Sequence, residues 1–508
     1  MTTFAAVDIG ANSVRLKIAR LVRQRLQTVH EDREVVRLGE SVFQTGMLAP
    51  SAMAQTVKVL RRFHKAVQLH GHAHTRVVAT SALRDARNSR AFIDWVHMRT
   101  GWRVEVISGI EEARLIHLGI ISNMRVTASP LLLIDLGGGS CELTISARHR
   151  IRETVSLPLG AVRLTQDFLH QDPPRDYELQ RLRSYIAEEV QRVARRIAAA
   201  HVQAVIATSG TAAALATSAP SLLKHPGREN KVATRAVVRL AEKLSKMSYA
   251  QRIKIPGIGT RRGEIIIAGA TAYAELLQRC DLGGFRYSDL GLRDGLLAQM
   301  TADYSRTAKR TQQLESERWN ALLAMAKRYR VNMEQAQHVR ALAMQLLTGL
   351  KSVHRLPPEY QEWLSGAAIL HEIGAYVNRM GWHRHAHYLI ANSEILGYTP
   401  AQRRVMAVVT RYLGNALPLP GDKLMRSLEP EDRENVPKAV ALLRLARALN
   451  QSRRRAVSAV QVRTRNSQVV LRLAERRAAG VDLELWAVKR ERAYFRAVFG
   501  RDLQAEAR

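Results

Sequence analysis

Acidic residues stand next to runs of glycine and small polar residues at two places in the first half of the chain. Asp8 begins the stretch D-I-G-A-N-S, and Asp135 begins the stretch D-L-G-G-G-S-C-E, which ends at Glu142. Backbone N–H groups of such turns can approach a phosphate closely because the side chains are short or missing. Carboxylates beside phosphate oxygens suit Mg²⁺. We therefore expect phosphate binding at these turns and a metal site at Asp135 and Glu142, with Asp8 either a further ligand or the cap of its own turn.

A pair of acids follows a third turn. The stretch I-S-G-I-E-E-A at 107–113 reads as the end of an apolar strand, a Ser-Gly turn and the start of a helix that carries Glu111 and Glu112. Acids in a first helical turn commonly complement the helix dipole. A carboxylate that faces bound phosphate can instead orient and deprotonate an attacking water. Spacing alone does not choose between the two glutamates.

Two arginines follow apolar strands in a similar way. Arg84 ends T-S-A-L-R at 80–84, and Arg293 lies in G-L-R-D-G at 291–295. A planar guanidinium matches the oxygens of a phosphate. Both are candidate phosphate ligands, although a surface position is the competing interpretation for any one arginine in so basic a chain.

The elements that carry these residues are expected to be duplicated. Residues 4–18 superpose on 131–145, and residues 77–81 superpose on 205–209, with nearly the same separation along the chain. Each copy opens with an apolar run, a turn and an alternating run, which is typical of two strands joined by a tight turn. A three-to-four spacing of apolar residues over 53–67 predicts a helix. The pattern indicates two α/β domains whose turns face one cleft.

The remainder of the chain has a different pattern of apolar residues. Long helical patterns cover 313–330 and 334–351, and two alternating runs between 460 and 473 flank Asn466-Ser467, which predicts a hairpin. We expect α/β domains over 1–125 and 126–303, a mostly helical domain over 304–455 and a small α+β piece over 456–508.

The composition of the chain limits the classes of binding partner. The 508 residues include 78 Lys and Arg against 45 Asp and Glu, a net charge of +33, which favours polyanions such as polyphosphate, nucleic acid or a membrane surface. Two cysteines exclude a disulfide framework or a cysteine-rich zinc module. The start of the chain has no signal-peptide pattern, so we expect a cytoplasmic protein. Only 5% of residues are aromatic, and we find no dedicated nucleic-acid module.

Six motifs together resemble the exopolyphosphatase and guanosine pentaphosphate phosphohydrolase family of the actin, hexokinase and Hsp70 superfamily. They are D-I-G-A-N-S at 8–13, T-S-A-L-R at 80–84, I-S-G-I-E-E-A at 107–113, D-L-G-G-G-S-C-E at 135–142, S-G-T at 209–211 and G-L-R-D-G at 291–295. The resemblance covers essentially the whole chain. It implies two actin-like, ribonuclease H-like domains followed by a helical HD-like domain.

The resemblance also assigns roles. It implies that Glu112 is the general base and that Asp135 and Glu142 belong to a Mg²⁺ site, with K⁺ as a candidate activator. The implied phosphate contacts are Asn12, Ser13, Arg15, Arg84, Gly138, Gly139, Ser140, Gly210 and Thr211. A homodimer is implied as well, and the charge leaves peripheral membrane contact as a further expectation.

The helical domain departs from the HD pattern. His371 is followed by Glu372, where an active HD metal site needs an aspartate, so we expect no hydrolysis there. The function expected from the whole sequence is processive, Mg²⁺-dependent hydrolysis of terminal phosphates from inorganic polyphosphate. The alternatives are guanosine pentaphosphate hydrolysis at the 5′ phosphate, a polyphosphate sensor without turnover, and a kinase or chaperone on the related fold, which needs an adenosine pocket that we do not find.

Overall fold

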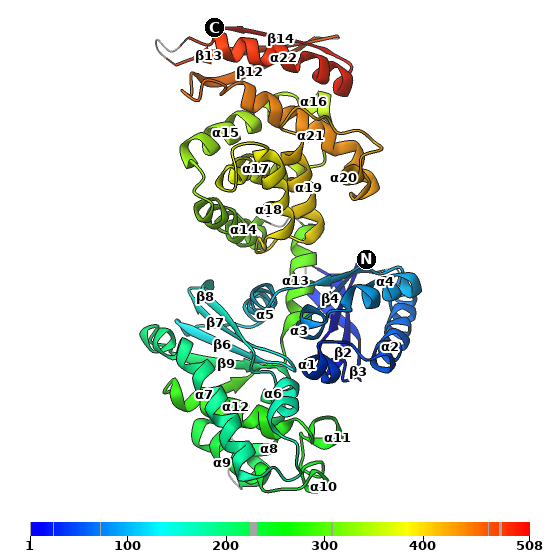
Figure 1. Cartoon of the computed structure of the whole chain (residues 1–508), viewed down its shortest axis with the longest axis vertical. Coiled ribbons are helices and arrows are strands. Elements are labelled where there is room, and N and C mark those ends of the chain that lie inside the picture. Colours follow the sequence, from blue (N-terminus) through cyan, green and yellow to red (C-terminus); the bar gives the residue numbers. More distant parts are fainter. Residues whose placement is uncertain are drawn as a thin grey trace. The chain divides into compact units, whose positions relative to one another are not determined.

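The computed structural model describes residues 2–507 except 24, 72, 224–230, 306–307, 466 and 477–479. It divides into two compact units, Met1–Thr311 and Gln312–Arg508, which are described separately (Figure 1).

A five-stranded mixed sheet organises the first part of the N-terminal unit. Its order is β3 (Arg25–Val35), β2 (Ser13–Val22), β1 (Thr3–Ile9), β4 (His74–Ala79) and β5 (Val104–Val106). Strands β1 to β3 are antiparallel neighbours, whereas β4 and β5 run parallel to β1. The helices of this part are α1 (Glu40–Thr45), α2 (Pro50–Leu69), α3 (Ser81–Asp85), α4 (Ser89–Thr100) and α5 (Gly109–Asn123). The predicted hairpin and the helix over 53–67 are therefore confirmed.

The second sheet repeats this arrangement. Its order is β8 (Arg150–Leu157), β7 (Cys141–Ala147), β6 (Leu131–Leu136), β9 (Ala204–Thr208), β11 (Gly284–Tyr287) and β10 (Lys231–Ala233). An antiparallel run, β8-β7-β6, is again followed by parallel β9. The helices are α6 (Ala161–Phe168), α7 (Asp176–Ala199), α8 (Ser209–Leu223), α9 (Thr234–Ser245), α10 (Tyr249–Arg252), α11 (Gly259–Arg262), α12 (Ile266–Arg279) and α13 (Leu292–Ser305). The duplication expected from the sequence is confirmed.

Strand alternation places helices α5 and α13 between the two sheets (Figure 1). In β1, Val7 and Ile9 face the core formed with α2 and α4, whereas Phe4 and Ala6 face the core that contains α5 and α13. In β6, Leu131 and Leu133 face that same inner core, and the intervening residues face α7 and α12. Asp8 and Asp135 continue the inward-facing series, so both carboxylates lie on the α5 side of their sheets.

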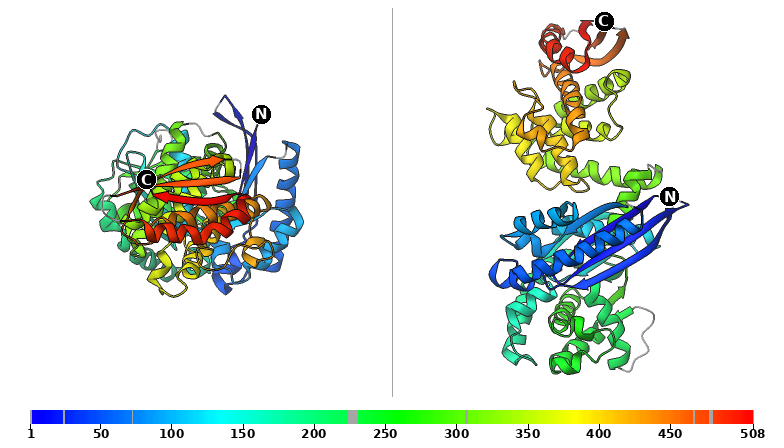
Figure 2. Two further views of the ribbon diagram at one scale, coloured as in Figure 1. Left: turned by 90° about the horizontal axis from the view of Figure 1, so that it is seen from above. Right: turned by 90° about the vertical axis from the view of Figure 1, so that its right-hand side faces the viewer.

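The C-terminal unit has one apolar core that runs from Leu322 to Leu503. Its helices are α14 (Ala308–Arg328), α15 (Met333–Gly349), α16 (Lys351–His354), α17 (Tyr360–Leu370), α18 (Trp382–Asn392), α19 (Pro400–Arg411), α20 (Lys423–Arg426), α21 (Pro430–Ala448) and α22 (Asp482–Phe499). The 3-10 helix η1 (Ile373–Tyr376) lies between α17 and α18. Strands β12 (Val457–Arg465), β13 (Gln468–Glu475) and β14 (Asp502–Ala507) form a sheet beside α22 (Figure 2).

Two expectations from composition can be compared with this structure. Cys141 and Cys280 are buried and unpaired, as expected of a chain without a disulfide framework. Among the described residues, no helix is both long enough and apolar enough to cross a membrane.

Candidate active site

The two phosphate-type turns, at residues 10–13 and 137–140, are closed by equivalent backbone hydrogen bonds and lie against one another. The Gly10 N–H donates to the Ser13 carbonyl over 3.1 Å, and the Gly137 N–H donates to the Ser140 carbonyl over 2.9 Å. A Cβ atom on Gly138 would lie only 3.0 Å from the Cβ of Ala11. The absence of a side chain at Gly138 therefore favours the close approach of the two turns, which border one cavity of about 410 Å³.

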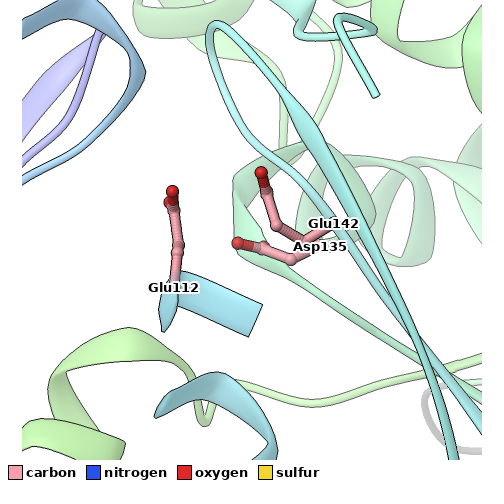
Figure 3. A group of neighbouring side chains, drawn as sticks. All are labelled: Glu112, Asp135 and Glu142. Atoms are coloured by element: carbon pink, nitrogen blue, oxygen red, sulfur yellow. The ribbon is translucent and has the colours of Figure 1, made fainter. Parts of the chain in front are cut away.

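Three carboxylates form a group beside this cavity, two of which, Glu112 and Asp135, line it. Glu112, Asp135 and Glu142 each offer an oxygen atom that lies within 4.8 Å of the others (Figure 3). Asp135 and Glu142 are direct cross-strand partners in β6 and β7, and Glu112 comes from α5 between the sheets. Asp8 lines the same cavity but does not belong to this group of three.

Burial makes the charged form of this carboxylate group costly. It raises the pKa of Asp135 to about 6, and it raises the pKa of Glu142 as well, with the Asp135 charge as the next cause. Ser156 donates to Glu142 Oε1 over 2.8 Å, whereas Oε2 of Glu142 is buried and has no partner among the described residues. An unsatisfied buried carboxylate oxygen within a set of hard oxygen donors fits Mg²⁺.

The structure separates the two glutamates that the sequence leaves open. Glu111 accepts two hydrogen bonds from the Arg114 guanidinium, at 2.8 and 2.9 Å. Glu112 is one residue further round the helix, and its side chain faces Asp135 and Glu142 (Figure 3). Burial and the neighbouring Glu142 charge raise the pKa of Glu112 well above its ordinary range. Ser108 caps the helix by accepting from the Glu111 N–H, which fixes this orientation.

Arg84 connects the carboxylate group to the second turn. Its Nη1 donates to Glu112 Oε2 over 3.1 Å and to the Ile107 carbonyl over 2.7 Å, and its Nη2 donates to Ser140 Oγ over 3.4 Å. The guanidinium therefore already lies where a phosphate bound at Ser140 would meet Glu112.

The third segment with a phosphate motif begins a helix. Ser209 starts α8 with φ of 73° and donates its hydroxyl to the Leu136 carbonyl over 2.7 Å. Gly210 lines the cavity, and a Cβ atom there would lie 1.2 Å from Nη2 of Arg262. Glycine at 210 thus leaves the space in which Arg262 reaches the cavity. Thr211 is buried, and a Cβ atom on Gly269 would lie 2.6 Å from its Cγ2.

Most of the site residues predicted from the sequence line this cavity, and the others lie outside its lining. The cavity is lined by Asp8, Asn12, Ser13, Arg15, Glu112, Asp135, Gly138, Ser140, Gly210 and Arg293. Arg84, Gly139, Glu142 and Thr211 lie outside this lining. Arg293 donates to the Leu16 carbonyl over 3.0 Å, so part of its guanidinium is held by strand β2.

Sequence reasoning missed three of the cationic side chains that line the cavity. Lys17, Arg33 and Arg262 all line it. Arg33 lies directly opposite Arg15 in the β2–β3 register, so counting back across the hairpin would have found it. Arg262 ends the four-residue helix α11, and no sequence signal connects it with the turns.

Comparison with known families agrees with this geometry. A model described as the Ppx/GppA phosphatase family matches residues 17–303, and one described as Ppx/GppA phosphatase, domain III, matches residues 318–492. The chain belongs to the Ppx/GppA phosphatase family. Membership in this family supports a phosphohydrolase.

Several solved structures resemble about three fifths of the chain. An exopolyphosphatase from Cytophaga hutchinsonii has a TM-score of 0.56 at 24% identity and covers 59% of this chain and 98% of its own. A Ppx/GppA family member from Aquifex aeolicus has a TM-score of 0.51 at 27% identity, covering 60% and 99%. An exopolyphosphatase-like protein has a TM-score of 0.55 at 30% identity, covering 60% and 98%.

The region with the HD-like pattern shows no metal-ligand group among the described residues. The ring Nδ1 of buried His371 lies 2.7 Å from the Ala368 carbonyl, and the carboxylate of Glu372 is paired with the guanidinium of Arg453. His383, His385 and His387 lie on α18. An arginine therefore already neutralises the one acid that follows His371.

Proposed function

We propose that this protein is an exopolyphosphatase, which hydrolyses the terminal phosphate of inorganic polyphosphate with Mg²⁺. The observation that carries the proposal is the meeting at one cavity of two phosphate-type turns, several cationic side chains, and a group of three carboxylates of which Glu112 and Asp135 line the cavity. Acidic side chains next to cationic side chains suit a substrate that brings several negative charges together with a divalent cation.

The residues divide the work in a definite way. The backbone N–H groups and hydroxyls of the turns at Asn12, Ser13 and Ser140 hold the terminal phosphate, and Arg84 binds its oxygens. Glu112 accepts a proton from a water that attacks the terminal phosphorus in line with the departing chain. The water oxygen forms the new P–O bond, the bridging P–O bond breaks, and orthophosphate leaves.

Asp135 and Glu142 are the residues that would hold Mg²⁺, with Asp8 as a further candidate on the same cavity. The bound ion supplies positive charge that offsets the phosphate oxygens and the neighbouring acids. Arg84 and the turns fix the orientation of the phosphate.

The principal alternative substrate is guanosine pentaphosphate. The residues that line the cavity include several arginines but a single aromatic side chain, Tyr287. Nucleobases are generally recognised by stacking on aromatic or guanidinium planes and by polar groups on the base edge. A lining dominated by charge favours an inorganic chain. A polyphosphate sensor without turnover is disfavoured because a binder has no need of Glu112 beside a metal site.

The test is phosphate release by the purified protein with Mg²⁺, using long-chain polyphosphate and guanosine pentaphosphate at matched concentrations of termini. We expect faster release from polyphosphate. Faster release from guanosine pentaphosphate would assign the nucleotide activity instead, and no release from either would leave the sensor as the better account.

A further inference from the structure

Arg33 carries buried hydrogen-bond donors that the protein leaves unused. It projects from β3 into the cavity, opposite Arg15. Its Nε and Nη2 atoms are buried and have no hydrogen-bond partner among the described residues. Leaving buried donors unsatisfied costs free energy, so such a group commonly marks a place that a ligand completes.

The acids near Arg33 are occupied by other cations. On the same strand, the carboxylate of Asp32 pairs with Arg62 at 3.0 Å, and Glu34 pairs with Arg62 at 3.2 Å. Glu31 lies 3.0 Å from Lys17, which also binds Asp294 at 2.7 Å. None of these contacts supplies the Arg33 guanidinium with a counter-ion.

The remaining surroundings of Arg33 are mainly cationic. Burial is the largest cause that lowers the pKa of Arg33, to about 10, followed by the charges of Arg15, Arg261 and Arg293, whereas Asp8 raises it. Burial and the charges of Arg33 and Arg15 likewise lower the pKa of Arg262, to about 9. An anion bound among these guanidinium groups would relieve their mutual repulsion.

We propose that Arg33 forms a second anion subsite, which receives a phosphate further along the substrate while the terminal phosphate lies at the turns and carboxylates. The inference rests on the proposed function and adds a residue that selects for chain length. Arg33 lines the same cavity as the turns, so one molecule can occupy both places. A substrate too short to reach Arg33 gains nothing from it, whereas every longer chain gains the same charged contact.

The test compares Arg33→Met, which keeps an apolar stem but removes the donors, with Arg25→Met. Arg25 lies on the same strand, is exposed and does not line the cavity, so it is a matched control. Phosphate release is measured with pyrophosphate, tripolyphosphate and long-chain polyphosphate under saturating Mg²⁺. If Arg33→Met does not fold, Arg33→Gln replaces it.

We expect Arg33→Met to raise KM about 10-fold for chains that reach Arg33, because a charged hydrogen bond is lost, with kcat nearly unchanged. The ratio of variant to wild-type KM should stay near one for the shortest substrate and rise to a plateau. Arg25→Met should match the wild type throughout. Unchanged KM at every length, or an equal loss at every length, would overturn the proposal.

A failure of the proposed function gives a different result. If the wild type releases no phosphate from any chain, binding of tripolyphosphate and of orthophosphate is measured by calorimetry for both proteins. The subsite would still be supported if Arg33→Met bound tripolyphosphate more weakly than the wild type but bound orthophosphate with the same affinity. Equal affinities in the two proteins would reject it, whatever the wild type hydrolyses.

Discussion

At the scale of single residues, the site concentrates negative charge that the fold does not neutralise. Glu112 and Glu142 are 8% and 2% exposed, and Arg84 is paired with Glu112 over 3.1 Å. Buried acids that face one another are destabilising unless protons or a cation neutralise them. We therefore expect this pair of acids to bind a cation.

The raised pKa of Asp135 gives a testable dependence on pH. A carboxyl whose pKa is raised on folding, here from 3.8 to about 6, stabilises the metal-free protein at low pH, and this contribution is lost as the pH rises through about 6. Mg²⁺ binds the deprotonated form. We therefore predict that Mg²⁺ raises the thermal unfolding midpoint more at pH 8 than at pH 5.

The control for this prediction is Asp135→Asn, which removes one of the two titrating ligands. The variant should show a smaller Mg²⁺ effect at pH 8 than the wild type, and its remaining dependence on pH should come from Glu142. A Mg²⁺ effect of the same size at both pH values in the wild type would contradict the assignment of these carboxylates as ligands.

At the scale of elements, one arginine connects the two halves of the site. Arg163 of α6 donates its Nε to the Gly139 carbonyl over 2.8 Å, and its Nη2 pairs with Asp85 of α3. Its guanidinium also lies 4.3 Å from the ring centroid of Phe43 in α1. Arg84 precedes Asp85 in the same short helix. Arg163 therefore fixes the position of Arg84 relative to the second turn, at Gly139.

We predict that Arg163→Met lowers kcat/KM on the order of 10²-fold, because misplacement of a binding group by about 1 Å can cost that much. The free energy of unfolding should change by only about 1 kcal/mol, since the ion pair with Asp85 is partly exposed. Steady-state kinetics and urea unfolding measure the two effects. Exposed Arg181 of α7, changed to Met, is the control. A loss of stability without a loss of activity would show that Arg163 only supports the fold.

The elements show what the sequence could predict. Strand alternation and turn residues predict both hairpins, and the duplication places Asp8 and Asp135 at equivalent positions, because these signals are local. The position of Arg262 at the cavity, by contrast, depends on tertiary packing. Arg262 reaches the cavity because Gly210 has no side chain, and that relation joins residues far apart in the sequence. The choice of Glu112 over Glu111 depends on which face of α5 meets Asp135 and Glu142, whereas the pair between Glu111 and Arg114 is local to one turn of the helix.

At the scale of the whole molecule, the residues of the site all lie in the N-terminal unit, Met1–Thr311. The C-terminal unit carries 32 Lys and Arg against 18 Asp and Glu, so it is strongly basic without contributing a metal-ligand group among its described residues. Such a charge favours the retention of a long polyanion.

This division predicts the behaviour of a fragment that ends at Thr311. The family structures that match 59% and 60% of this chain are almost completely covered by the match, so a protein of about that length is a complete fold. The fragment should hydrolyse tripolyphosphate at a rate similar to that of the full chain but lose preference for long chains. Phosphate release from both substrates measures this. Equal losses on both would contradict a role of the C-terminal unit in holding long substrates.

The most direct test of the account is the Glu112→Gln variant, assayed beside the wild type for polyphosphate binding and for phosphate release with Mg²⁺. Glutamine keeps the shape of the side chain but cannot accept the proton of the attacking water. We predict that binding is retained and that turnover falls by about 10²- to 10⁴-fold, the usual contribution of a general base. Turnover equal to that of the wild type would contradict the account.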